Sequence, residues 1–305
     1  MLWPLGACAL LAGCGPQYVV LHPAGPVAST ELHLIETVSI AMAAVILFVV
    51  ALFVIALVRF RDRPGNKAPY SPDWDGSRTL EVIWFLIPVL ILAVIAVPTV
   101  RQTYALAHLP KQADPLIIDV TSLDWKWLFE YPAQHIATVN YIEVPTGTPV
   151  LYELTANSPM NTFWVPQLGG MEYTMPGRVL PLWLQADKPG VYWGRSANFS
   201  GRGFVDMLFD IQAVPAAEFQ TWVQGVQQTA PAMAAAEYQR LLKFGTAGRA
   251  TYSAYPAGTF PQTTNGFSLQ GGMYMPTAVP GGASAAASPS AAMAPSAAMA
   301  MGGNG

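Results

Sequence analysis

Cysteine and histidine are scarce in this chain, whose 305 residues include two cysteines and four histidines. Thiolate and imidazole are the donors that hold copper and zinc in proteins, so this composition can build few metal sites. Both cysteines lie within the first fourteen residues, and no two histidines have the spacing of metal ligands. The sequence therefore predicts no bound metal and assigns the histidines to ordinary surfaces or interfaces; they are His22, His33, His108 and His135.

Charged side chains are also scarce, at 11% of the chain against 52% hydrophobic residues, and the formal net charge is -3. Proteins that bind nucleic acid need a basic surface, and nucleotide-binding folds carry a glycine-rich phosphate loop after a strand. The chain has neither feature, so we expect no nucleic-acid partner. Its composition lies between that of a soluble protein and that of an integral membrane protein.

Two long uncharged runs account for this composition. Residues Thr37 to Val58 and Val82 to Val100 are rich in Ile, Val, Leu and Phe, and each run can cross a bilayer as a helix. We therefore predict transmembrane helices at residues 34–58 and 81–101, joined as a helical hairpin. Buried helices of a soluble protein are the alternative, but two runs of this length with so few polar positions favour the bilayer.

The segment between the two runs, residues 59–80, contains more basic than acidic side chains. Basic loops stay on the cytoplasmic side of a membrane. We therefore expect a protein of the bacterial cytoplasmic membrane with both termini on the periplasmic face, where residues 14–33 form an exported N-terminal segment. The basic residues of the cytoplasmic loop are Arg59, Arg61, Arg63, Lys67 and Arg78.

The sequence Leu11-Ala12-Gly13-Cys14 follows an apolar stretch and has the form of a bacterial lipobox. We expect residues 1–13 to be a lipoprotein signal peptide and Cys14 to carry the lipid, a palmitate, so that the mature chain keeps no free thiol. The alternative is a chance match in a leader rich in alanine and leucine, and this leader lacks the usual basic residues at its start. The exported position expected for this end favours lipidation.

From about residue 111 the sequence changes to short runs of β-branched and aromatic residues separated by Gly, Pro, Asn and Asp. Such runs predict strands and turns. Seven or eight strands in about 100 residues is the size of a Greek-key sandwich, so we predict an all-β cupredoxin-like domain over residues 111–214. The expected strands are Leu116–Val120, Trp125–Tyr131, Val139–Val144, Val150–Leu154, Val179–Leu184, Val191–Arg195 and Phe204–Gln212.

Residues 196–207 have the outline of a loop that binds two copper ions but lack almost all of its ligands. In cupredoxin domains with such a centre the loop reads Cys-x-x-x-Cys-x-x-x-His-x-x-Met, with another His about thirty-five residues upstream. Here only the methionine is kept. The degenerate copper-ligand positions are Asn161, Ser196, Asn198, Ser200, Phe204 and Met207.

Through this loop, and through the segments 163–170 and 175–177, the chain resembles subunit II of the haem-copper respiratory oxidases. Because these ligands are lost, the chain looks like the quinol oxidase branch, of cytochrome bo type, rather than the cytochrome c oxidase branch. The resemblance covers roughly residues 10 to 265. It implies that segment 163–170 shapes loops that face a catalytic subunit, where an apolar surface makes a permanent interface.

The resemblance implies a non-redox subunit II in a proton-pumping terminal quinol oxidase. This chain would bind no cofactor and perform no catalysis, while subunit I would carry the haems, the copper, the quinol pocket and the reduction of oxygen to water. Further small membrane subunits and the lipid bilayer are the other expected partners. One alternative is a cytochrome c oxidase subunit, which would need Cys at 196 and 200 and His at 161 and 204. Another is a free-standing membrane lipoprotein with a ligand-binding cupredoxin-like domain.

The segment 124–132 matches an aromatic strand that lies near the electron entrance in copper-bearing relatives. Without copper, electrons that passed along the aromatic residues of this strand would have no acceptor. We therefore favour a packing role for Trp125, Trp127 and Tyr131, which alternate onto one face of a strand.

Glu81, Trp84 and Pro88 fall at helical spacing at the start of the second run and share one face. The resemblance places Glu81 at the cytoplasmic mouth of a proton pathway of the catalytic subunit, because this sequence matches the family's Leu-Glu-x-x-Trp-x-x-x-Pro pattern. A glutamate that only stabilises the helix end through the dipole is the alternative. The proline, which suits a buried seam between helices, favours the proton role.

Beyond the sandwich we expect a helical and aromatic-rich extension at residues 215–265. Helical spacing predicts a helix at 217–228, with Phe219, Trp222, Val223 and Val226 on its apolar face, and a short helix at 234–244. Residues 276–305 consist mainly of Ala, Ser, Gly, Pro and Met and predict a disordered tail. Its methionines lack the neighbouring His or Cys that a copper(I) site would need.

Overall fold

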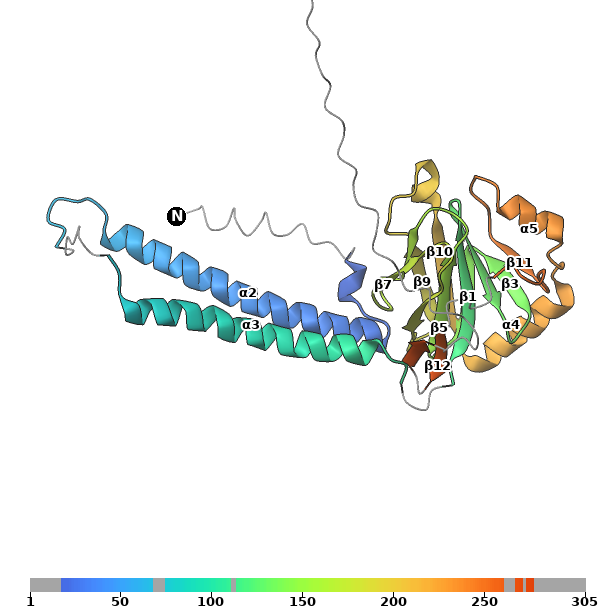
Figure 1. Cartoon of the computed structure of the whole chain (residues 1–305), viewed down its shortest axis with the longest axis horizontal. Coiled ribbons are helices and arrows are strands. Elements are labelled where there is room, and N and C mark those ends of the chain that lie inside the picture. Colours follow the sequence, from blue (N-terminus) through green and yellow to red (C-terminus); the bar gives the residue numbers. More distant parts are fainter. Residues whose placement is uncertain (1–17, 68–74, 111–113, 261–266, 271–272, 277–305) are drawn as a thin grey trace, which may run out of the picture.

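The computed structural model describes residues 18–67, 75–110, 114–260, 267–270 and 273–276. It consists of a long helical hairpin that projects from one end of a β-sandwich (Figure 1). The predicted signal peptide, Cys14 and most of the predicted tail lie outside the described residues.

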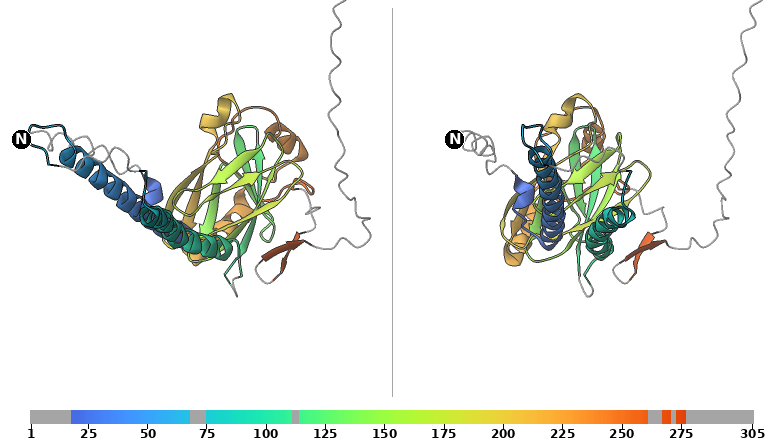
Figure 2. Two further views of the ribbon diagram at one scale, coloured as in Figure 1. Left: turned by 60° about the vertical axis from the view of Figure 1, so that its left-hand side comes forward. Right: turned by 90° about the vertical axis from the view of Figure 1, so that its left-hand side faces the viewer.

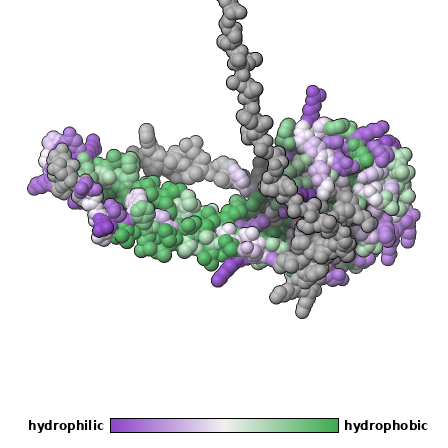
Figure 3. All heavy atoms as spheres, viewed as in Figure 1, coloured by the Kyte–Doolittle hydropathy of each residue, from purple (hydrophilic) through white to green (hydrophobic). Residues whose placement is uncertain are grey.

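The hairpin consists of α2 (Pro26–Arg59) and α3 (Arg78–Leu106), preceded by the short 3-10 helix η1 (Val19–Leu21). Both helices are long and apolar enough to cross a membrane. Exposed apolar side chains occur at consecutive positions along both helices, so they are not confined to one stripe. Figure 3 shows one face of the hairpin, which is largely green. Each helix contains the predicted run but extends beyond it, since α2 begins at Pro26 and α3 ends at Leu106.

Two sheets form the sandwich, and Figure 2 shows them from two further directions. The first sheet has the order β11-β3-β2-β1-β5-β8 and the second the order β4-β10-β9-β6-β7. The strands of the first sheet are β1 (Leu116–Leu123), β2 (Lys126–Tyr131), β3 (Ile136–Val139), β5 (Val150–Ala156), β8 (Leu180–Leu184) and β11 (Ala250–Tyr252). Those of the second are β4 (Tyr141–Pro145), β6 (Asn161–Trp164), β7 (Met171–Thr174), β9 (Gly190–Arg195) and β10 (Leu208–Val214).

An aromatic core fills the space between the sheets. The rings of Trp127 and Phe129 on β2 pack against Phe209 on β10, with centroids 5.3 and 5.5 Å apart, and Phe163 on β6 stacks on Phe209 at 4.7 Å. All four side chains are almost wholly buried. Because buried aromatic rings bring large apolar areas out of water, this cluster supplies much of the stability of the domain. The packing role predicted for Trp127 and Tyr131 agrees with their place in this core.

The C-terminal extension covers the edge and the outer face of the first sheet. α4 (Ala216–Thr229) buries Phe219, Val223 and Val226 against the main core, as its helical spacing predicts. α5 (Ala235–Leu241) contributes Leu241 to a second, smaller core on the outer face of β1, β2 and β3. The strands β12 (Phe267–Gln270) and β13 (Met273–Pro276) form a separate two-stranded sheet.

Several strand predictions need correction. Residues 139–144 form parts of two strands, because Asn140 has a φ of 59° and the chain turns there from one sheet to the other. Residues 202–206 form the 3-10 helix η2 (Arg202–Asp206) rather than the start of a strand. Trp125 also has a positive φ, 61°, and precedes β2 instead of belonging to it. The strands β6 and β7 were not among those predicted.

The first turns of α2 are fixed to the sandwich by backbone hydrogen bonds. The amide of Ala24 donates to the carbonyl of Gln167 over 2.8 Å, and the amide of Ala28 donates to Leu168 over 3.2 Å. Val27 belongs to the main core. Segment 163–170, expected to face a partner subunit, thus makes contacts with the hairpin of its own chain.

Candidate functional site

The degenerate copper-ligand positions gather at one end of the sandwich, in the loop between β9 and β10 and at the start of β6. The hydroxyl of Ser196, just after β9, lies 3.2 Å from Oδ1 of Asn161 and 3.2 Å from the carbonyl of Asn198. The amide of Thr162 donates to the Ser196 oxygen over 3.5 Å. Asn161 and Ser196 are both 1% exposed. The fold therefore brings Asn161, Ser196 and Asn198 together.

Further side-chain hydrogen bonds tie the loop to β6. The amide of Ala197 donates to the hydroxyl of Thr162 over 2.6 Å, and the Asn198 side chain donates to the carbonyl of Met160 over 2.9 Å. Asn161 in turn donates to the carbonyl of Pro159 over 2.9 Å. Where copper-bearing relatives would use a metal to join the loop to the upstream strand, this chain uses amide and hydroxyl groups.

Met207, the one retained ligand residue, is fully buried beneath the loop. Its side chain belongs to the main core, and its carbonyl accepts a hydrogen bond from Nε1 of Trp127 over 3.4 Å. Trp125 packs on the other part of the loop, donating through Nε1 to the carbonyl of Ser200 over 3.0 Å. Gly203 lies against the Trp125 ring so closely that a Cβ would collide with it. Aromatic packing thus holds this part of the loop in shape.

Two apolar side chains are exposed on the outer surface of the loop. Phe199 is 76% exposed and Val205 is 70% exposed, and the Phe199 and Phe204 rings lie 5.7 Å apart. The guanidinium of Arg195 lies 5.7 Å from the centroid of the Phe204 ring, at cation–π distance. An exposed surface of this kind favours contact with another protein over contact with water.

The donor set does not fit a copper pair. Copper in a cupredoxin site needs soft thiolate and imidazole ligands, whereas these positions offer neutral oxygens and an aromatic ring. The side chains of Asn161 and Ser196 are already hydrogen-bonded to each other and to the backbone. Among the described residues, no group of three or more His, Cys, Asp or Glu side chains is placed to hold a metal ion.

Glu81 lies far from this loop, in the first turn of α3 at the end of the hairpin remote from the sandwich (Figure 1). Its backbone amide donates to the carbonyl of Ser77 over 3.0 Å. Its side chain is exposed and lines a shallow groove on α3 together with Arg78 and Phe85. Glu81 thus occupies a helix N-terminus at the expected water boundary, which fits both interpretations of this residue.

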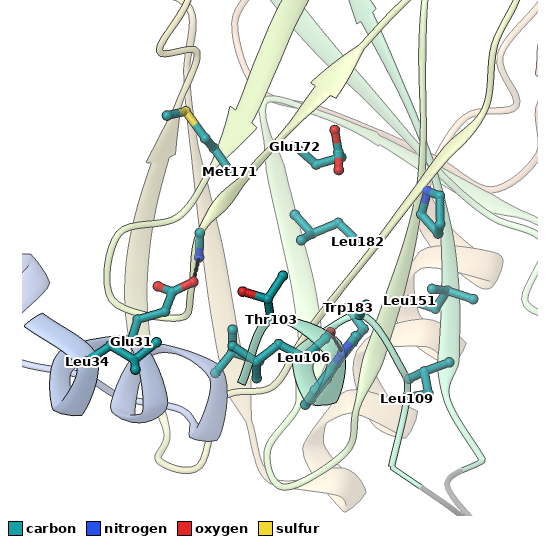
Figure 4. A pocket seen from close by; sticks show the side chains of 14 residues that line it. Glu31, Leu34, Thr103, Leu106, Leu109, Leu151, Met171, Glu172, Leu182 and Trp183 are labelled. Carbon is teal, nitrogen blue, oxygen red and sulfur yellow. Dashed lines mark hydrogen bonds between the residues drawn. The ribbon is translucent and has the colours of Figure 1, made fainter. Parts of the chain in front are cut away.

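A cavity of about 400 Å³ that the sequence analysis did not predict lies where the hairpin meets the sandwich. Glu31 on α2 accepts a hydrogen bond from the amide of Gly170 over 2.9 Å, and Trp183 on β8 donates to the carbonyl of Leu106 over 2.7 Å (Figure 4). Sequence spacing gave no signal for this site, because its walls come from five separate segments. The cavity therefore lies at the joint between the hairpin and the sandwich.

Comparisons with known proteins agree with this architecture. Residues 17–101 match the family described as Cytochrome C oxidase subunit II, transmembrane domain, and residues 99–214 match Cytochrome C oxidase subunit II, periplasmic domain. The two matches confirm a transmembrane hairpin followed by a cupredoxin-like sandwich.

Curated relatives cover most of the chain. It is 46% identical over 257 residues to Quinol oxidase subunit 2 of Bacillus cereus, a match that spans 83% of this chain and 88% of that protein. It is 41% identical over 249 residues to Quinol oxidase subunit 2 of Bacillus subtilis, with 80% and 77% covered. It is 39% identical over 242 residues to Ubiquinol oxidase subunit 2 of Acetobacter aceti, with 78% of each chain covered.

Proposed function

This chain belongs to the cytochrome c oxidase subunit II family, and we propose that it acts as the non-metal-binding subunit II of a terminal quinol oxidase. The observation that carries the proposal is the loop at 196–207, where hydrogen bonds and aromatic packing stand in place of copper ligands. The relatives named quinol oxidase subunit 2 support the same branch of the family. An interpretation as a cytochrome c oxidase subunit fails at positions 161, 196, 200 and 204.

Without a metal of its own, the chain cannot carry electrons between a donor and oxygen. Subunit I is therefore its partner and holds the haems, the copper, the quinol pocket and the site of oxygen reduction. The chain supports assembly of the complex and covers subunit I on the exported side. The exposed apolar tip at Phe199 and Val205 and the apolar hairpin are surfaces suited to such a permanent interface. Further small membrane subunits complete the complex, which couples oxygen reduction to proton pumping.

In this proposal the sandwich and both termini lie on the periplasmic side, with the basic loop 59–80 in the cytoplasm. Cys14 carries a lipid after removal of residues 1–13, which adds a second anchor to the two helices. Labelling of growing cells with a radioactive fatty acid tests this point. The label should enter the wild-type chain and be lost in Cys14→Ser; equal labelling of both chains would contradict lipidation at this residue.

Glu81 is proposed as the entrance of a proton pathway that continues in subunit I. Its support is its place in the first turn of α3, beside Arg78 and at the expected boundary between membrane and water. Trp84 and Pro88 lie on the same face and would form the seam with the partner helix. A carboxylate at this boundary can collect protons for a buried channel.

The donor specificity of the intact complex tests the proposed function. The complex should be purified through this chain and assayed for oxygen uptake with a soluble quinol and, separately, with reduced cytochrome c. We expect haem-containing subunit I to copurify, rapid oxygen uptake with quinol, and none above background with cytochrome c. Rapid turnover with cytochrome c, or isolation of the chain without a haem protein, would contradict the proposal.

A further inference from the structure

Three carboxylates stand side by side across the first sheet. In the strand register, Asp119 on β1 lies opposite Glu130 on β2 and opposite Glu153 on β5. Directly opposed side chains on neighbouring strands have Cβ atoms about 5 Å apart, and like charges at that distance are destabilising. All three side chains leave the sheet on its outer face, because their neighbours Val120, Phe129 and Leu154 point into the core.

The C-terminal extension closes over this carboxylate row. A cavity beside it is lined by Asp119, Glu153 and His135 from the sandwich and by Tyr255 and Thr259 from the extension, and its lining contains no lysine or arginine. Tyr238 on α5 also approaches, donating to the carbonyl of Thr259 over 3.2 Å. Lys126, the basic side chain on the same face of β2, is occupied elsewhere: its ammonium donates to the carbonyls of Asp124, Lys243 and Gly245. Lys126 therefore does not balance the charges of Asp119 and Glu130.

The hydrogen bonds of Glu130 indicate that it holds a proton. Its side chain is 1% exposed, and its Oε2 is buried without a hydrogen-bond partner among the described residues. Its Oε1 is in hydrogen-bond contact with the Thr259 hydroxyl, which also lies 3.0 Å from the carbonyl of Pro256. A hydroxyl has a single proton, so it cannot donate to both acceptors. If Glu130 is protonated, it can donate to Thr259 while Thr259 donates to Pro256, and both contacts are satisfied.

We propose that Asp119 and Glu130 form a proton-binding site whose protonation holds residues 250–260 against the sheet. Loss of the proton leaves adjacent like charges under the extension and breaks the chain of donors through Thr259, so the extension loosens as the pH rises. Burial, together with the charges of Glu153 and Glu130, raises the pKa of Asp119 to about 8, and burial raises the pKa of Glu130 to about 7. With the topology proposed above, the site would respond to the pH of the exported compartment.

Hydrogen exchange of the full chain in lipid nanodiscs, followed by mass spectrometry, tests the coupling. After correction for the intrinsic pH dependence of exchange, protection of residues 250–260 should fall roughly tenfold or more between about pH 6 and pH 9, since one pKa unit of coupling is a tenfold change in the docking equilibrium. Protection of β9 should stay constant. Two single variants, Asp119→Asn and Glu130→Gln, each replace one carboxyl by a group that cannot ionise. In both variants the extension should stay protected at high pH.

Asp114→Asn is the matched control, because Asp114 is an exposed carboxylate just before β1. This variant should keep the wild-type pH dependence. As a second readout, infrared titration should show a protonated carboxyl band that wild type loses on alkalinisation and that Asp119→Asn reduces. Equal protection at both pH values in wild type, a pH response unchanged in both neutral variants, or absence of the carboxyl band would overturn the proposal.

Discussion

The hydroxyl of Ser196 lies 3.2 Å from Oδ1 of Asn161 across 35 residues of sequence, and both side chains are almost wholly buried. In copper-bearing relatives the equivalent positions are a cysteine and a histidine that meet through the metal, as the resemblance implies. Here the same two backbone segments meet through a hydrogen bond. The loop and the upstream strand are therefore joined by groups that need no metal.

Substitution Ser196→Ala should destabilise the sandwich. It removes the group that contacts Asn161 and Thr162 and leaves buried polar atoms without a partner, which costs roughly 1–3 kcal/mol in the free energy of unfolding. Denaturant unfolding of the full chain measures the change. The control is Ser158→Ala, whose hydroxyl is less buried and lies 3.2 Å from the carbonyls of Ser122 and Pro159. Equal stability of Ser196→Ala and wild type would show that the hydrogen bond does not hold the loop.

Substitution Gly169→Ala should weaken the joint between hairpin and sandwich. A Cβ at this position would lie 2.6 Å from Cδ2 of Leu184 and 2.7 Å from Cγ1 of Val27, so the core must shift. Overpacking of this kind costs roughly 1–3 kcal/mol. Gly225→Ala in α4 is the control, because a Cβ at this position would meet nothing within 4 Å. This substitution should stabilise the helix by at most about 1 kcal/mol, since alanine has a higher helix propensity than glycine. Thermal unfolding of both variants in detergent distinguishes them, and similar behaviour would contradict the packing at Gly169.

Substitution Glu81→Ala in the assembled oxidase should slow turnover and the reduction of the binuclear haem-copper centre, because the proposed pathway loses its proton collector. Glu36→Ala, at an exposed position of α2, should leave both rates unchanged. If Glu81 only interacts with the helix dipole, its loss should reduce helix stability by about 0.3–1 kcal/mol and leave the rates unaltered. Unchanged rates in Glu81→Ala would therefore exclude the proton role.

Glu143 on β4 should make stability depend on pH. Burial, and then the charge of Glu218, raise the pKa of Glu143 to about 7 from 4.5. Because the folded pKa exceeds the unfolded one, this group's contribution to folding is complete below the unfolded pKa and is lost as the pH rises through about 7. Glu143→Gln should therefore gain stability relative to wild type between about pH 5 and pH 8 in denaturant unfolding. The exposed carboxylate variant Asp206→Asn should show no such gain, and a constant difference between Glu143→Gln and wild type would contradict the shift.

Periodicity and composition predicted the parts of the fold that depend on long, uniform patterns. The two apolar runs are long enough to exclude most alternatives, and the stripe of Phe219, Val223 and Val226 fixes which face of α4 packs. The strand boundaries were harder to predict. The β-branched residues on both sides of Asn140 gave no indication that the chain turns there between two strands. Short, partly polar strands such as Asn161–Trp164 have too few residues to show an alternating pattern.

The candidate site was predictable only as far as it is local. The spacing of Ser196, Ser200, Phe204 and Met207 predicts one loop, and the loop exists. Tertiary contacts decided the remainder: the ammonium of Lys126 bonds to the carbonyl of Lys243, 117 residues away, and Thr259 contacts Glu130 from the C-terminal extension. No pattern within the sequence joins such residues, because each contact depends on how separate segments pack.

The metal content of the purified oxidase tests the central claim most directly. Copper and haem iron should be quantified in the intact complex, and the dicopper signal should be sought by electron paramagnetic resonance. We predict that the complex contains only the copper of the partner's catalytic centre and that the dicopper signal is absent. Additional copper that stays with this chain when the subunits are separated, together with a dicopper signal, would contradict the account.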